Sequence, residues 1–145
     1  TMSDLEEIKL AIAAAKSTGL PVIASMTFDS GKNKDRTMMG VTPEQAASEL
    51  ADAGVDVIGA NCGQDIESYV SICSRLRAAT QLPIWIKPNA GLPEMIDNKA
   101  VYRTTPQQFA SHANKLIEAG ASFIGGCCGS NPEFIRLLAS SLQHS

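Results

Sequence analysis

The chain has 145 residues, 44% of them hydrophobic and 19% charged, which is the size and balance of one globular domain with a buried core. Its net charge of −3 gives it no electrostatic attraction for nucleic acid or an anionic membrane, and no apolar run is long enough to cross a bilayer. The acidic start "TMSDLEEIK" does not resemble a signal peptide, so we expect a cytoplasmic protein, whose cysteines are metal ligands, catalytic groups or buried thiols rather than disulfides.

Helical and strand-like segments alternate along the chain. Apolar residues at helical spacing occupy residues 3–18, and Gly19 ends that helix. Two later helices begin with a threonine cap followed by proline, at Thr42 and at Thr105. The expected strands are 20–29, 55–63, 82–91 and 121–129, and the expected later helices are 42–54, 65–80, 105–120 and one that opens at Asn131. A loop is expected between 92 and 104. Helices between consecutive apolar strands predict an α/β fold with a parallel sheet covered on both faces.

An internal repeat refines this prediction. The segment "AGVDVIGANCG" (53–63) aligns without gaps to "AGASFIGGCCG" (119–129), with matches at Ala, Gly, Ile, Gly, Cys and Gly. Repeated strand–helix units of this kind favour a (βα) barrel over a doubly wound sheet. No glycine-rich phosphate-binding loop supports a nucleotide-binding alternative.

The repeat places Cys62 and Cys128 at the same point, the carboxyl end of a strand, and puts Cys127 in the place of Asn61. That end of the strands carries the active site in parallel α/β folds. A catalytic zinc requires three protein ligands and one open position, and the three cysteines would supply the ligands. Adjacent strand residues point to opposite faces, so the strand must break for Cys127 and Cys128 to share a metal, and the glycines around them allow this. On spacing alone, small buried thiols are an equal alternative, and Cys73, inside a helix, is expected to be buried.

Three motifs carry a resemblance to a known family. "GANCG", "KPNAGLPE" and "GGCCGSNPEFIR", in this order, closely resemble the homocysteine S-methyltransferases, which include the homocysteine-binding barrel of cobalamin-dependent methionine synthase and betaine–homocysteine methyltransferase. The resemblance implies a (βα)8 TIM barrel in which Cys62, Cys127 and Cys128 bind Zn²⁺. It also implies an enzyme that transfers a methyl group to the thiol of homocysteine, giving methionine.

Further site residues follow from the same resemblance. Asn89, in "KPNAG", is expected either to fill the open zinc position before substrate arrives or to cap a turn, and "NAGLP" is closer to the cobalamin-dependent branch. Asn61 braces the loop beside Cys62 or serves a plain turn. Thr27 and Asp29 end the first strand on the same face, where they contact substrate or are ordinary polar loop residues.

A barrel of this class needs about 250 residues, so the resemblance makes residues 1–145 a single domain, the C-terminal half of the barrel. The expected partners are homocysteine, a corrinoid protein carrying methylcobalamin, and either the missing N-terminal half-barrel or a second copy that closes a homodimer. Betaine and S-methylmethionine are alternative methyl donors. The alternative function is a non-catalytic zinc-thiolate or assembly module that needs a partner half.

Overall fold

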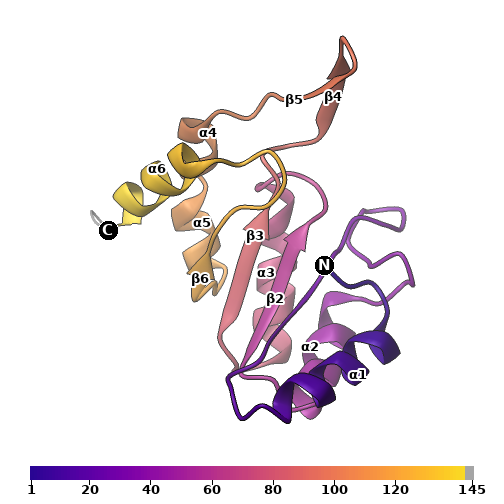
Figure 1. Ribbon diagram of the computed structural model, residues 1–145. Coiled ribbons are helices and arrows are strands. Elements are labelled where there is room, and N and C mark those ends of the chain that lie inside the picture. The colour runs from indigo at the N-terminus through magenta and orange to yellow at the C-terminus, as the bar shows by residue number, and fades with distance from the viewer. Residues whose placement is uncertain (143–145) are drawn as a thin grey trace.

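The computed structural model describes residues 1–142 and arranges them as a parallel sheet backed by helices (Figure 1). The helices are α1 (Leu5–Lys16), α2 (Pro43–Asp52), α3 (Ser68–Ala79), α4 (Pro106–Ala110), α5 (Ala113–Glu118) and α6 (Pro132–Leu142). The strands are β1 (Ile23–Met26), β2 (Val57–Cys62), β3 (Ile84–Pro88), β4 (Pro93–Ile96), β5 (Lys99–Tyr102) and β6 (Phe123–Ile124). Among residues 1–142, no helix combines the length and apolar character needed to span a membrane.

Four strands form the main sheet in the order β1-β2-β3-β6, and every neighbouring pair is parallel. This confirms the predicted α/β fold with strands that alternate with helices. The sheet is wider than the sequence indicated, because Met2 forms a parallel bridge with Met26 beside β1. The residues before α1 therefore extend that edge of the sheet by one isolated β-bridge.

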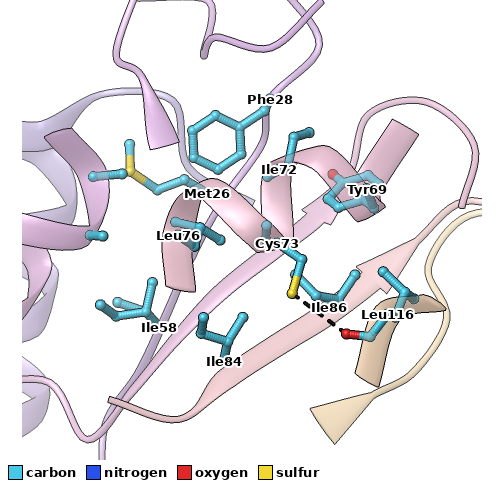
Figure 2. Close-up of a cluster of buried hydrophobic side chains, with 14 of the residues drawn as sticks. Met26, Phe28, Ile58, Tyr69, Ile72, Cys73, Leu76, Ile84, Ile86 and Leu116 are labelled. Atoms are coloured by element: carbon cyan, nitrogen blue, oxygen red, sulfur yellow. Dashed lines mark hydrogen bonds between the residues drawn. The ribbon is translucent and has the colours of Figure 1, made fainter. Parts of the chain in front are cut away.

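The two faces of the sheet differ. On one face, side chains of β1, β2 and β3 are buried against the helices, and Figure 2 shows Ile58, Ile84 and Ile86 in this core with Tyr69 and Leu76 of α3. The residues that alternate with them form a second face, which we call the open face: Ile23, Ser25, Val57, Gly59, Asn61, Trp85, Lys87, Phe123 and Gly125. The expectation that both faces are covered is wrong within residues 1–142, since Ile23 is 44% and Phe123 50% exposed.

The helix beginnings follow the sequence closely. Thr42 and Thr105 each form a capping box with the glutamine three residues later, with proline in the first turn. The predicted helix 105–120 is divided into α4 and α5. The Gln108 carbonyl accepts the Ser111 hydroxyl at 2.7 Å and lies 3.0 Å from the His112 ring nitrogen. These side chains compete for a carbonyl that an uninterrupted helix would pair with a backbone N–H.

The segment between β3 and α4 is a hairpin, where a loop was expected. Strands β4 and β5 pair antiparallel around Asp97 and Asn98, whose φ angles are 49° and 58°. Two consecutive left-handed residues are typical of a tight hairpin turn, and Asp and Asn tolerate this conformation better than most residues. The hairpin projects away from the end of the sheet where β3 finishes (Figure 1).

Candidate metal centre

The structure brings the three predicted cysteines together. The sulfur atoms of Cys62, Cys127 and Cys128 all lie within 4.8 Å of one another, and this is the one such cluster of potential metal ligands found among residues 1–142. The Cys62 and Cys128 sulfurs are 3.9 Å apart. Cys62 ends β2 and the other two follow β6, so the cluster joins two strand ends that are not neighbours in the sheet.

The backbone after β6 gives the two adjacent cysteines different hydrogen bonds. The N–H groups of Gly125 and Cys127 continue the hydrogen bonds to β3, both at 2.9 Å, so Cys127 keeps a strand position. The N–H of Cys128 leaves this ladder and donates instead to Oδ1 of Asn89 at 3.0 Å. Gly129 then turns the chain with φ of 79°. The predicted break of the strand therefore lies at Cys128.

A second backbone turn positions Cys62. Regular alternation would point Cys62 to the helix side, because its neighbour Asn61 belongs to the open face. Cys62 instead has φ of 63° and Gly63 has φ of 64°, so the chain turns at the end of β2. Glycine suits the second position, because a Cβ on Gly63 would be strained at this φ and would lie 3.0 Å from the Tyr69 hydroxyl and 3.1 Å from the Phe28 carbonyl. The left-handed backbone at Cys62 is strained and is found beside the cysteine cluster.

Asn89 links the two strand ends. Its Nδ2 donates to the Gly63 carbonyl at 2.9 Å and lies 3.8 Å from the Cys62 sulfur, while its Oδ1 accepts the Cys128 N–H. The same side chain therefore braces both halves of the cluster. A carbonyl oxygen that accepts one hydrogen bond keeps a second lone pair, so this role is compatible with the predicted fourth ligand.

Asn61 contacts the cluster from the open face. Its Nδ2 lies 3.8 Å from the Cys127 sulfur and donates to the Thr1 hydroxyl at 2.6 Å, and its Oδ1 accepts the Ser25 hydroxyl at 2.5 Å. The residue was expected to brace the loop beside Cys62 or to serve a turn. Its observed partner in the cluster is Cys127.

The three thiols influence one another electrostatically. Burial acts to raise the pKa of Cys127, but hydrogen bonds from the Asn61 side chain and from Cys128 outweigh it, so that pKa lies below the ordinary thiol value. Burial, the contact with Cys62 and the charge of Cys127 raise the pKa of Cys128 to about 11. Without a cation, Cys127 therefore loses its proton before Cys128, and the resulting charge opposes a second thiolate beside it.

The other predicted residues are less closely tied to the cluster. Thr27 is 6% exposed, and its hydroxyl has no hydrogen-bond partner among residues 1–142. Asp29 is exposed and accepts the Ser30 hydroxyl at 2.9 Å. Cys73 is fully buried, as expected, with its sulfur 3.9 Å from the Leu116 carbonyl (Figure 2).

Sequence reasoning missed Tyr69. This side chain of α3 is fully buried, and its hydroxyl has no partner among residues 1–142. Burial raises the pKa of its phenol, and the charges of Cys62, Cys127 and Asp29 raise it further, so the hydroxyl lies close to the cluster. In the sequence Tyr69 is one apolar position of a helix, with no signal that distinguishes it from other core residues.

The donor set fits zinc. Sulfur ligands select soft metals such as zinc, and catalytic zinc sites take three protein ligands and keep one position open. The negative charge of a deprotonated Cys127 opposes deprotonation of Cys128. A cation bound between the sulfurs would offset that charge. The amides of Asn61 and Asn89 lie 3.8 Å from two of the sulfurs, where outer hydrogen bonds orient metal ligands.

Comparison with known proteins identifies relatives of the whole chain. Betaine–homocysteine S-methyltransferase 1 of Danio rerio is 32% identical over 159 residues, which cover 96% of this chain and 38% of that protein. Methionine synthase of Mycobacterium tuberculosis is 29% identical over 151 residues, covering 99% of this chain and 12% of that protein. The chain thus spans less than half the length of these relatives.

Solved structures share the fold. The apo form of the homocysteine methyltransferase MmuM from Escherichia coli superposes with a TM-score of 0.75 at 22% identity, covering 97% of this chain and 48% of that chain. Its metallated form gives a TM-score of 0.74. The family model described as homocysteine S-methyltransferase matches residues 1–142. The chain therefore belongs to the homocysteine S-methyltransferase family.

Proposed function

We propose that residues 1–145 are the zinc-binding, C-terminal half of a (βα)8 barrel that methylates the thiol of homocysteine to give methionine. The observation that carries this proposal is the cluster of three cysteine sulfurs within 4.8 Å of one another, at the carboxyl ends of parallel strands. In barrels of this class the active site lies at that end. In the reaction, homocysteine loses its thiol proton, its sulfur forms a bond to the methyl carbon, and the donor leaves with the electrons of the broken bond.

Cys62, Cys127 and Cys128 would hold the zinc and leave one position open. Bound by these three sulfurs, zinc would act as a Lewis acid that favours the thiolate form of homocysteine near neutral pH. Asn61 and Asn89 orient the ligands through N–H groups directed at two of the sulfurs. In the absence of substrate, the side-chain oxygen of Asn89 would serve as the fourth ligand. Three thiolates would outweigh the divalent cation by one negative charge, which would keep the substrate sulfur electron-rich.

Thr27 and Asp29 are proposed to contact the amino-acid part of homocysteine. The support is the Thr27 hydroxyl, which is buried without a hydrogen-bond partner among residues 1–142. A buried hydroxyl without a partner is destabilising, so a ligand group that pairs with it gains binding energy. Asp29 lies two residues further along the same strand end, and its carboxylate suits the amino group of an amino acid.

Zinc analysis of cysteine variants tests the site. We expect one zinc per chain in the wild type and loss of most zinc in Cys62→Ser, Cys127→Ser and Cys128→Ser. Cys73→Ser is the matched control, because Cys73 lies in the core away from the cluster and should leave the zinc content unchanged. Undiminished zinc in Cys128→Ser would contradict the proposed ligand set.

Methionine formation from homocysteine tests the activity. The assay offers methylcobalamin, betaine and S-methylmethionine in turn, to the chain by itself and to the chain fused behind the N-terminal half-barrel of a relative. The alternative function is a non-catalytic zinc-thiolate or assembly module that needs a partner half. A zinc-loaded fusion that forms no methionine from any donor would support that alternative.

A further inference from the structure

The turn after β6, which carries two of the three clustered cysteines, is rich in glycine. Glycine occupies three of the five positions from 125 to 129, so this backbone has access to many conformations. Cys128 has left the strand ladder. Its N–H donates to Oδ1 of Asn89 at 3.0 Å, and its carbonyl accepts the N–H of Ala90 at 2.9 Å. These two bonds fix Cys128 itself, and the glycine that follows it needs a contact of its own.

The ring of Tyr102 makes that contact. A Cβ on Gly129 would lie no farther than 2.7 Å from Cγ, Cδ1 and Cδ2 of this ring, so the ring occupies the space that a side chain at position 129 would need. Tyr102 is the last residue of β5 and packs, partly buried, against the core. The contact therefore joins the hairpin β4–β5 to the residue that follows Cys128.

The other leg of the hairpin reaches the same turn. Asn89 and Ala90, which bond to Cys128, lie just before β4, and in Figure 1 the loop between β6 and α6 passes the base of the hairpin. The two legs also meet each other, because a Cβ on Gly91 would lie 2.7 Å from the hydroxyl oxygen of Thr104. The cysteine turn is therefore held between the two legs of the hairpin.

This inference rests on the proposed function, in which Cys128 is a metal ligand. We propose that Tyr102 is a positioning residue of the metal centre, whose ring holds the turn at Gly129 in the conformation that places the Cys128 sulfur within 4.8 Å of the other two cysteine sulfurs. A mobile turn loses conformational entropy when its cysteines bind a metal, whereas a turn that is already ordered loses little. The ring thus raises the metal affinity without touching the metal.

Metal affinity measured in Tyr102 variants tests the role of the ring. Tyr102→Ala should raise the dissociation constant for zinc on the order of 10-fold, as the loss of outer contacts does at other metal sites. Tyr102→Phe keeps the ring and should bind zinc as the wild type does. With cobalt(II) in place of zinc, Tyr102→Ala should show weaker thiolate-to-metal charge-transfer absorption per bound ion, because Cys128 binds less of the time. Met95→Ala, in the exposed part of the hairpin, is the matched control and should change neither.

A double-mutant cycle separates the ring contact from a general loss of order. Gly129→Ala adds a Cβ that is strained at φ of 79° and collides with the ring. In the Tyr102→Ala background the strain remains but the collision does not. Gly129→Ala should therefore weaken zinc binding by a smaller factor in that background than in the wild type. Equal factors in the two backgrounds would contradict the contact.

Amide hydrogen exchange in the metal-free protein gives a readout that does not depend on zinc. The N–H groups of Ala90 and Cys128 should exchange faster in Tyr102→Ala than in the wild type, while the N–H of Gly125, which bonds to β3, should be unchanged. Equal exchange in the two proteins, or equal zinc affinity, would overturn the proposal. A wild type that binds no zinc would contradict the proposed function, and exchange at Cys128 would then decide by itself whether Tyr102 holds the turn.

Discussion

Cys62 combines a proposed ligand role with an unfavourable backbone conformation. Its φ of 63° lies in the left-handed region, which disfavours every residue with a Cβ. The next residue, Gly63, takes the same conformation without this cost. A glycine at position 62 would suit the turn better than cysteine, so the sulfur, and not the backbone, explains the residue found there.

Replacing Cys62 by glycine or by alanine separates the two contributions. Both variants should lose zinc. In the absence of metal, Cys62→Gly should unfold with a free energy about 1 kcal/mol higher than Cys62→Ala, because only alanine retains the left-handed strain. Urea denaturation with a chelator present measures the difference. Ala60→Gly, in the regular part of β2, is the control and should lose stability. A Cys62→Gly protein less stable than Cys62→Ala would show that the turn is not strained.

Helices and strands could be predicted where their signals are local. The threonine–proline starts of α2 and α4 appear in the structure with complete capping boxes, and the repeat placed Cys62 and Cys128 correctly at one end of the sheet. The hairpin β4–β5 was missed because its strands are short and all but two of its residues are exposed, which leaves no clear alternation to detect. The contact of Asn61 with Cys127 could not be predicted either, since it depends on the pairing of strands far apart in the sequence.

An ion-pair network joins α2, α3 and the loop before α2. Arg75 of α3 contacts Glu44 at 2.5 Å and Asp35 at 2.6 Å. The hydrogen bond from Arg75 lowers the pKa of Glu44 from its ordinary value near 4.5 to about 2. A carboxylate with a depressed pKa stabilises the fold above its unfolded pKa, and that contribution disappears as the pH falls through the folded pKa.

Glu44→Gln should therefore destabilise the protein in a pH-dependent way. Because Glu44 is largely exposed, we expect a loss of about 1 kcal/mol in the free energy of unfolding at pH 7. The difference between wild type and variant should shrink between pH 4.5 and pH 2. Urea denaturation across this range provides the measurement, with Glu118→Gln on an exposed part of α5 as control. An equal loss at pH 7 and at pH 2 would indicate that the effect is not the ion pair.

At the scale of the whole molecule, the described residues bury one face of the sheet and leave Ile23 and Phe123 on the other face about half exposed. Apolar strands in the sequence indicated a sheet covered on both sides, and composition alone does not reveal that residues 1–142 cover only one of them. The three cysteines connect β2 with the turn after β6, and β3 lies between these two strands. A metal bound there would cross-link the sheet at the end where β6 contributes only a short pairing with β3.

Zinc should consequently stabilise the fold by an amount that rises with the logarithm of its free concentration above the dissociation constant. A ligand that binds only the folded state at 100 times its dissociation constant adds about 2.7 kcal/mol, which raises the melting temperature on the order of 10 °C in a chain of this size. Thermal unfolding followed by circular dichroism, with zinc buffered at several free concentrations, measures this shift. Cys73→Ser should show the full shift even if its buried core position lowers the starting temperature, whereas Cys128→Ser should show almost none. A shift of equal size in Cys128→Ser would mean that zinc stabilises the protein at some other place, and that the cluster joining β2 to the turn after β6 is not the metal centre.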